Sequence, residues 1–341
     1  MGFLVSNGYI LLTTALFSAA LTFGLIKLHQ SKGAVAIRKH AVPPLGGLAI
    51  FISFWSGFFF LFPTLLFNSS QWMLFVASSV ILLTGVIDDF IVLKPYQKSI
   101  GILLAANIVY FMADIEFSTA LLPAIPTGVF NILSYFLTIM WIYFVTNAIN
   151  LLDGLDGLAS SVSIVSLLTL AITSYFFSLS IRITFLMMLL LLAAAMLGFL
   201  PFNWYKAKIY LGDTGALFIG FMYATLTVTN LKNASFFSMI VPIILYIVPL
   251  FDTSYAIFRR LMTGRSMIER DEDHVHHRLL RLGMSEPLVV SIMLGVTLLF
   301  SILAILSHVY PHWRNLILGL AIVMIGLMFI AMIKLSDTPK K

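Results

Sequence analysis

The sequence has no cysteine, and only 10% of its 341 residues are charged. Without cysteine, the chain can form no disulfide bond, no thiolate nucleophile and no thiolate metal site. Soluble domains carry about a quarter of their residues as Asp, Glu, Lys or Arg, so this composition excludes the soluble class. No basic residue precedes Lys27, which argues against a secretory signal and predicts that the first apolar segment is retained as a helix.

The chain consists largely of long apolar segments, and 60% of its residues are hydrophobic. A membrane-spanning helix needs about 20 apolar residues, and the runs lack the two-residue alternation of barrel strands. We therefore predict an all-α, polytopic membrane bundle of about eleven transmembrane helices, forming a single domain over 1–341. The expected spans are 6–27, 44–66, 72–87, 99–113, 128–146, 158–177, 183–201, 214–229, 236–258, 288–307 and 315–333.

Basic residues are distributed on one side of this predicted bundle. All Lys and Arg except Arg182, Lys232 and Arg314 fall in every second polar break. Cytoplasmic loops are enriched in Lys and Arg, so the rich side is predicted to be cytoplasmic, with the N-terminus outside and the C-terminus inside. The loops 28–43, 88–98, 147–157, 203–215 and 259–287 should then build one cytoplasmic site. The longest of them is too short for a nucleic-acid surface, and no nucleic acid is expected.

Two acidic residues, Asp88 and Asp89, end the third apolar segment. Adjacent carboxylates repel one another and oppose the dipole of a helix C-terminus, so a cation should compensate them. Mg²⁺ or the nearby Lys94 and Lys98 could do so. The alternative is a solvated helix end without function.

Polar side chains recur at every third position in the loop 147–157, at Asn147, Asn150, Asp153 and Asp156. Such a row contains no base, and Gly154 and Gly157 allow close approach of a ligand, which favours a cation or ribose site. In the loop 203–215, Asp213 lies between two glycines where an apolar run begins. This position suits both a helix cap and, together with another Asp, a Mg²⁺ site.

Three histidines, His274, His276 and His277, fall within four residues. With no cysteine and with hard oxygen ligands elsewhere, phosphate contacts are favoured over a zinc site. Asp252 lies inside the ninth segment and needs a partner, for which Arg259, seven positions on, is one option. We expect a structural or supporting role for Asp252.

Taken in order, the Asp88-Asp89 pair, Asn147–Leu158, Leu211–Gly215 and His274–His277 resemble the polyprenyl-phosphate N-acetylhexosamine-1-phosphate transferases. The resemblance implies that a lipid phosphate attacks the β-phosphate of a UDP-amino sugar, releasing UMP, with Mg²⁺ (or Mn²⁺) as cofactor. It implies catalytic roles for Asp88, Asp89, Asp153, His276 and His277, and metal contacts for Asp213, Asn150 and Asp153. It also implies nucleotide contacts for Lys39, Asp156, Tyr210 and Asn150, and phosphate or sugar contacts for Lys94, Lys98, Arg265, His274, His276, His277 and Arg278.

The histidine run separates two branches of the resembled family. The muramoyl-pentapeptide branch typically has three adjacent histidines, whereas here Val275 interrupts the run, as in the branch that uses UDP-N-acetylglucosamine. The expected partners are therefore UDP-N-acetylglucosamine, undecaprenyl or another polyprenyl phosphate, and the bilayer of a bacterial plasma membrane, with a homodimer possible. The muramoyl-pentapeptide transferase and, more remotely, an ion-coupled transporter stay open as alternatives.

Overall fold

The computed structural model describes residues 2–31, 42–64, 69–118, 125–177, 183–231, 243–244, 246–263 and 274–336, and every regular element within these ranges is helical. Seven of the described helices are long and apolar enough to cross a membrane. The all-α, multi-pass membrane bundle is therefore confirmed. The helices are α1 (Gly2–Gln30), α2 (Gly46–Leu61), α3 (Ser69–Ile91), α4 (Pro95–Met112), α5 (Thr127–Leu152), α6 (Leu158–Phe177), α7 (Ile183–Asn203), α8 (Gly212–Leu231), α10 (Ile247–Thr263), α11 (Val275–Arg281), α12 (Glu286–Val309) and α13 (Arg314–Ser336), with a 3₁₀ turn η4 (Pro311–Trp313).

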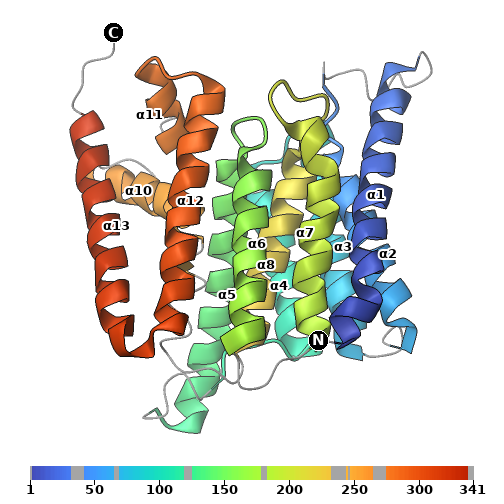
Figure 1. Cartoon of the computed structure of the whole chain (residues 1–341), viewed down its shortest axis with the longest axis horizontal. Helices are drawn as coiled ribbons and strands as arrows, with labels where there is room; N and C mark the ends of the chain where they lie inside the picture. Colours follow the sequence, from blue (N-terminus) through green and yellow to red (C-terminus); the bar gives the residue numbers. More distant parts are fainter. Residues whose placement is uncertain are drawn as a thin grey trace.

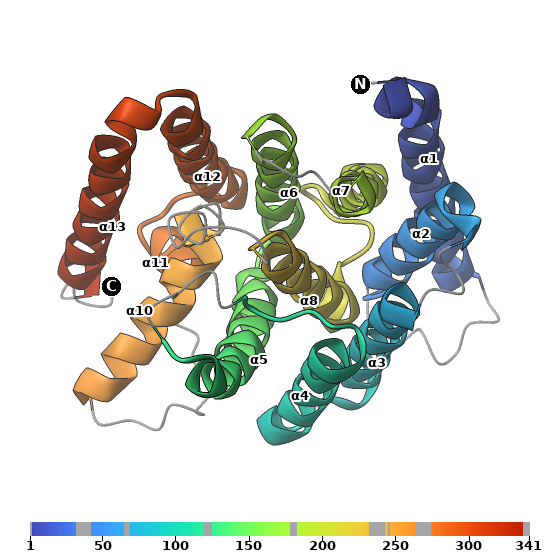
Figure 2. The same cartoon turned by 90° about the horizontal axis from the view of Figure 1, so that it is seen from below.

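Helix α8 lies in the middle of the bundle, with α2, α3, α5, α6 and α7 around it (Figure 2). Its side chains from Ala216 to Val228 are almost all buried. At the edge of the bundle, α13 buries few residues and presents most of its apolar side chains outward. An outward apolar surface is stable in lipid, which fits the membrane composition of the chain.

One end of the bundle collects the polar helix ends. The N-terminus of α1 lies at the opposite end from the C-terminus of α13 (Figure 1). We call the end that carries Asp88, Asp89, Asp153, Asp156 and Asp213 the polar face. These acids come from three separate loops or helix ends, as the sequence predicted for loops on one side of a membrane.

Two glycine contacts bring three helices together at the polar face. A Cβ atom on Gly47 of α2 would lie 2.1 Å from the backbone nitrogen of Gly215. A Cβ atom on Gly85 of α3 would lie 2.4 Å from the Cα atom of Thr214. Real side chains do not tolerate such distances, so glycine at both positions allows α2 and α3 to pack directly on the start of α8.

Helix α10 departs from the predicted span 236–258, of which only residues 243–244 and 246–258 are described. It extends to Thr263 and lies across the other helices: Figure 1 shows it nearly end-on, and Figure 2 shows its full length. Its Phe251 and Tyr255 pack against Met332 and Phe329 of α13. A helix with one apolar side facing a neighbouring helix does not need apolar residues all round, so it is not restricted to the spanning direction.

Candidate active site at the polar face

Asp89, in the last turn of α3, caps the first turn of α8. Its carboxylate accepts hydrogen bonds from the backbone N–H of Asp213 (2.8 Å), the backbone N–H of Thr214 (3.0 Å) and the Thr214 hydroxyl (2.5 Å). The first amides of a helix have no partner within the helix, and a carboxylate at that position also meets the positive end of the helix dipole. The cap thus comes from another helix and fixes the backbone that carries Asp213.

Gly212 makes room for this cap. Its φ is +72°, and a Cβ atom there would lie 2.7 Å from both Asp89 Oδ2 and the carbonyl oxygen of Pro44. Backbone bonds from Gly46 N–H to the Tyr210 carbonyl and from Gly47 N–H to the Leu211 carbonyl, each 3.0 Å, tie the preceding loop to the start of α2. The glycine that the sequence analysis noted beside Asp213 is therefore required by close packing.

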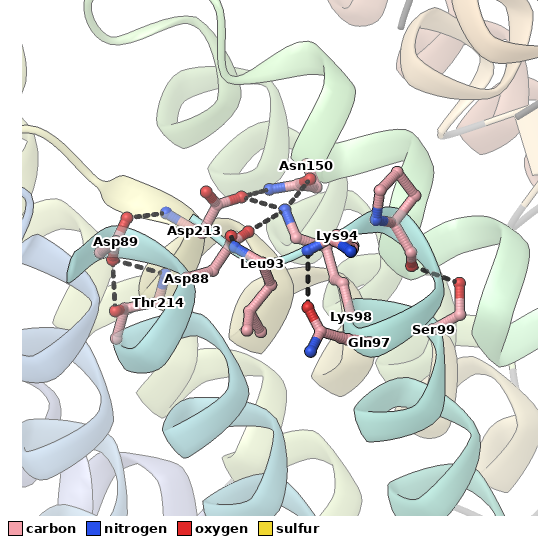
Figure 3. A network of polar contacts seen from close by, with 11 residues as sticks. Asp88, Asp89, Leu93, Lys94, Gln97, Lys98, Ser99, Asn150, Asp213 and Thr214 are labelled. Carbon is pink, nitrogen blue, oxygen red and sulfur yellow. Dashed lines mark hydrogen bonds and ion pairs between the residues drawn. The ribbon is translucent and has the colours of Figure 1, made fainter. Parts of the chain in front are cut away.

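Lys98, in the first turn of α4, joins the acids of two other helices (Figure 3). Its Nζ atom lies 2.5 Å from Asp88 Oδ2 and 2.7 Å from Asp213 Oδ1, and it donates to Asn150 Oδ1 at 3.2 Å. The Asn150 side-chain amide also donates to Asp213 Oδ1. Asp88 is buried and accepts a further bond from the Leu93 backbone N–H at 2.6 Å. The ammonium group of Lys98 is thus the cation that compensates Asp88.

The turn that follows α5 carries Asp153 and Asp156. Asp156 Oδ2 accepts a hydrogen bond of 2.8 Å from the Ala207 backbone N–H, which ties this turn to the loop after α7. The loop is held from inside by Asn203, whose amide donates to the Ile209 carbonyl at 3.1 Å. The same Asn203 accepts a bond from the Ser160 hydroxyl at 3.1 Å. These contacts fix the loops 147–157 and 203–215 relative to one another.

A cavity of about 680 Å³ lies between these loops. This size falls within the range of about 300 to 1,000 Å³ that is usual for small-ligand sites. Its wall is acidic, because five carboxylates line it, and Lys206 is the basic group in the wall. The lining residues are Pro44, Asp89, Asn150, Asp153, Gly154, Leu155, Asp156, Asn203, Tyr205, Lys206, Tyr210, Leu211, Gly212, Asp213 and Glu286.

Burial and the negative charges of Asp213, Asp89 and Asp156 raise the pKa of Asp153 well above its usual range. A carboxylate in such surroundings is stabilised in its charged form when a cation approaches. Within the described residues, no three His, Asp or Glu side chains converge on one point as a preformed metal cage. Mg²⁺ does not need such a cage, since it commonly uses one or two carboxylates and takes water and phosphate oxygens for the rest. Asp213, Asn150 and Asp153 fit that requirement.

The histidines approach the same turn from α11. A Cβ atom on Gly154 would lie 2.3 Å from His276 Nε2, so the ring sits directly on this glycine. His276 is 1% exposed, and neither ring nitrogen has a hydrogen-bond partner among the described groups. Burial lowers its pKa to about 4. The rings of His274, His276 and His277 lie with centroids 4.2 to 6.3 Å apart.

The structure brings together most of the residues that the sequence pointed to. Asp88, Asp89, Lys98, Asn150, Asp153, Asp156, Tyr210 and Asp213 lie in or beside the cavity, and His276 borders it at Gly154. Lys94 is exposed at the N-terminal cap of α4 and does not line the cavity. Lys39 and Arg265 lie outside the described residues.

The position of Arg278 differs from the phosphate or sugar contact that was expected of it. Its guanidinium does not face the cavity: it is 3% exposed, donates to the Met332 carbonyl at 2.8 Å and the Tyr255 hydroxyl at 3.2 Å, and lies over the Tyr255 ring. The carboxylate of Asp252 contacts His274 and the Val275 backbone N–H, which agrees with the structural or supporting role expected for it. Spacing along one helix could not reveal these contacts, because Arg278 and Asp252 each contact residues of other elements.

Sequence reasoning missed Lys206, Tyr205 and Glu286 as cavity residues. Lys206 and Tyr205 precede Asp213 in the same loop, and a basic residue beside a predicted diphosphate site was the available signal for Lys206. Glu286 begins α12, where an acid also suits the helix dipole, so the sequence offered no reason to place it at the cavity.

Comparisons of the sequence with known proteins show which family the chain resembles. The family described as glycosyl transferase family 4 matches residues 71–230. A probable undecaprenyl-phosphate N-acetylglucosaminyl 1-phosphate transferase of Bacillus subtilis is 32% identical over 278 residues, 81% of this chain and 76% of the relative. A decaprenyl-phosphate N-acetylglucosaminephosphotransferase of Mycobacterium tuberculosis is 31% identical over 82% of this chain and 77% of the relative. An undecaprenyl-phosphate alpha-N-acetylglucosaminyl 1-phosphate transferase of Escherichia coli is 35% identical over 34% of this chain and 32% of the relative.

Proposed function

This chain belongs to glycosyl transferase family 4, and from that premise we propose that it transfers N-acetylglucosamine 1-phosphate from UDP-N-acetylglucosamine to a polyprenyl phosphate. In this reaction an oxygen of the lipid phosphate forms a bond to the β-phosphorus of the nucleotide sugar. The bond from that phosphorus to the bridging oxygen breaks, and UMP leaves with the bridging oxygen. The lipid-linked sugar diphosphate would be the first intermediate of a cell-envelope glycan.

The observation that carries the proposal is the acidic cavity at the helix ends, with Lys98 placed between Asp88 and Asp213. The acceptor is a lipid, so its phosphate must meet a soluble nucleotide where apolar helices end. The polar face provides such a position. Asp88 belongs to α3 itself, whereas Asp153, Asp156 and Tyr210 belong to the loops beyond the helices. A soluble ligand can reach the loop residues while the lipid chain stays among the helices.

Magnesium fits the acidic part of this cavity. Asp213, Asn150 and Asp153 would hold Mg²⁺, or Mn²⁺ in its place, and a bound ion would neutralise charge on the diphosphate. Oδ1 of Asp213 accepts from both Lys98 and Asn150, which holds the carboxylate in place. A bound cation would therefore use the other oxygen, Oδ2, or displace the Lys98 ammonium group from Oδ1.

The remaining residues bind and orient the two substrates in this proposal. Asp88 lies at the lipid phosphate, and little basicity is required of it because a phosphate monoester is already largely dianionic at pH 7. Lys98, next to Asp88, offers a positive charge to the transferred phosphate. Asp156 and Tyr210 border the uracil, and His276 and His277 approach the sugar diphosphate from α11.

The same proposal sets the orientation in the membrane. The rule that cytoplasmic loops are rich in Lys and Arg places the polar face in the cytoplasm, where UDP-sugars are made. Helix α8 ends at the other face and α11 starts near the polar face (Figure 1), so the chain between them changes sides once. With α1 to α8 before it and α12 and α13 after it, that passage makes eleven crossings in total, and it is the ninth of them, with α10 lying within it.

The test uses purified protein in detergent with UDP-N-acetylglucosamine, undecaprenyl phosphate and Mg²⁺. We expect UMP and a lipid-linked product only when both substrates and Mg²⁺ are present. Turnover of UDP-N-acetylmuramoyl-pentapeptide with none of UDP-N-acetylglucosamine would reject the sugar assignment, and ion flux without UMP release would reject the enzyme.

The metal assignment needs its own variants. Asp213→Asn should abolish Mg²⁺-dependent turnover. Asp114→Asn is the matched control, because Asp114 lies after α4 at the other end of the bundle. Near wild-type turnover of the Asp213 variant would remove this residue from the metal site.

A further inference from the structure

Lys206 is the basic side chain in a cavity wall that carries five carboxylates. The residue is exposed, and within the part of the chain that the structure describes no hydrogen bond or ion pair engages its ammonium group. Opposite charges in one wall attract each other, yet Lys206 pairs with none of these acids. Its ammonium group is therefore available to an anionic ligand in the cavity.

The backbone beside Lys206 is held on one side of the cavity. The Ala207 N–H donates to Asp156 Oδ2 at 2.8 Å. The Trp204 ring lies against Gly157, where a Cβ atom would be 3.0 Å from the ring atom Cε3. These two contacts fix the loop over the turn that follows α5. From this fixed backbone the Lys206 ammonium group moves on a flexible four-carbon stem.

The other lysine of the site, Lys98, is held among acids. An ammonium group has three hydrogens. Lys98 directs them to Asp88, Asp213 and Asn150, at 2.5, 2.7 and 3.2 Å. Lys98 is also not one of the residues that line the cavity. Among the described lining residues, Lys206 is thus the cation that can move onto a ligand.

We propose that Lys206 binds the α-phosphate of the uridine nucleotide and, after transfer, the phosphate of the departing UMP. This inference rests on the proposed function, in which Asp88 lies at the lipid phosphate and Asp156 borders the uracil. The α-phosphate joins the uridine to the transferred β-phosphate, so it belongs to the nucleotide side of the cavity. Lys206 is anchored on that side, next to the residue that binds Asp156.

The charge on the α-phosphate grows during the reaction. In the UDP-sugar this phosphate is substituted on both sides and carries one negative charge. When the bond from the β-phosphorus to the bridging oxygen breaks, that oxygen stays on the α-phosphate, and UMP leaves largely as a dianion. Five carboxylates in the wall repel such a product, and a cation stabilises it most where the new charge develops. Loss of Lys206 should therefore weaken the binding of UMP more than that of the UDP-sugar.

Calorimetric titration of the whole protein in detergent with Mg²⁺ tests this contact, with UMP and uridine as the probes. Uridine lacks the phosphate, so its affinity should not change in Lys206→Gln, whereas that of UMP should fall about tenfold, as for one lost hydrogen bond to a charged group. Lys206→Arg keeps the charge and should retain most of the affinity. In turnover, Lys206→Gln should raise the inhibition constant of UMP and leave the KM of undecaprenyl phosphate unchanged.

Lys208→Gln is the matched control. Lys208 is exposed in the same loop and carries the same charge, but it does not line the cavity. Three results would overturn the proposal. These are an unchanged affinity of Lys206→Gln for UMP, an equal loss of affinity for UMP and uridine, and an equal loss of UMP affinity in Lys208→Gln.

A second measurement uses the wild-type protein alone. UMP, but not uridine, should slow the modification of Lys206 by an amine-reactive reagent, while Lys208 reacts at the same rate throughout; peptide mass spectrometry reads both sites. Equal modification of Lys206 with UMP and with uridine rejects the contact, even if no variant folds. If the protein releases no UMP from UDP-N-acetylglucosamine and UMP still protects Lys206, the proposed function fails and the contact stands. Normal release without protection has the opposite meaning.

Discussion

Asp89 and Thr214 are joined by two hydrogen bonds, from the Thr214 backbone N–H (3.0 Å) and from its hydroxyl (2.5 Å) to the same carboxylate oxygen. They lie 125 positions apart in the chain. The end of α3 thereby supplies the cap that α8 lacks in its own sequence. Asp88, next to Asp89, contacts Lys98 instead, so the paired acids have separate tasks.

Replacing Asp89 by Ala should destabilise the protein and displace Asp213. Loss of a helix cap costs about 1 to 2 kcal/mol, and here three bonds are lost together. We expect a lower melting temperature and weaker Mg²⁺-dependent UMP release. Thr214→Val, which removes only the hydroxyl bond, is the milder control. If Asp89→Ala melts like wild type, the carboxylate is not a structural cap.

Replacing Lys98 by Met should make stability depend more strongly on metal. Without the ammonium group, Asp88 and Asp213 lose their shared cation, so the variant should melt at a lower temperature than wild type in the presence of a chelator. Added Mg²⁺ should then raise its melting temperature by more than it raises that of wild type. The exposed Lys208→Met should respond like wild type. Equal Mg²⁺ shifts in all three proteins would contradict the prediction.

Gly212→Ala should severely impair folding or activity. A methyl group there meets Asp89 Oδ2 and the Pro44 carbonyl oxygen at 2.7 Å, and the positive φ is unfavourable for alanine. The comparison is Gly319→Ala in α13, where nothing lies within 4 Å of the new Cβ atom. That substitution should be neutral or raise the free energy of unfolding by up to about 1 kcal/mol, because alanine favours the helix. Yield, melting temperature and UMP release should be measured for both variants. Wild-type values for Gly212→Ala would contradict the close contacts described at Gly212.

Acidification should destabilise the protein through His276. The pKa of this group is lowered from 6.5 to about 4 by burial, so the unfolded chain binds a proton over a pH range in which the folded chain does not. Stability is therefore complete above about pH 6.5 and falls as the pH drops toward 4, by about 3 kcal/mol at most. Melting temperatures of wild type and His276→Phe across this range check the prediction. The variant should show a flatter dependence, and identical slopes would contradict it.

Much of the fold followed from local pattern. Apolar runs of membrane length predicted the positions of α1, α5, α6, α7, α12 and α13 well, because lipid leaves helices as the only available structure for such segments. The prediction for α10 was wrong in the extent and the direction of the helix. Its run of apolar residues up to Phe258 looks like a span, but its orientation depends on Phe329 and Met332 of α13, which no local pattern contains.

In the candidate site, too, the local sequence predicted some features and left others undetermined. Residue type and spacing drew attention to Asp88, Asp153 and Asp213, since carboxylates near hydrocarbon need a cation. They could not separate Asp88, which pairs with Lys98, from Asp89, which caps α8. Nor could they show that the Arg278 side chain turns away from the cavity.

The sequence by itself determined a helical membrane protein with its acidic and histidine loops on one face, because hydropathy and charge act locally and each segment shows them alone. Only the tertiary structure decided which acid caps a helix, which acid holds Lys98, and which acid faces His274. Those roles arise from contacts between helices that are distant in sequence, and they depend on close packing at Gly47, Gly85 and Gly212 that composition and spacing do not encode.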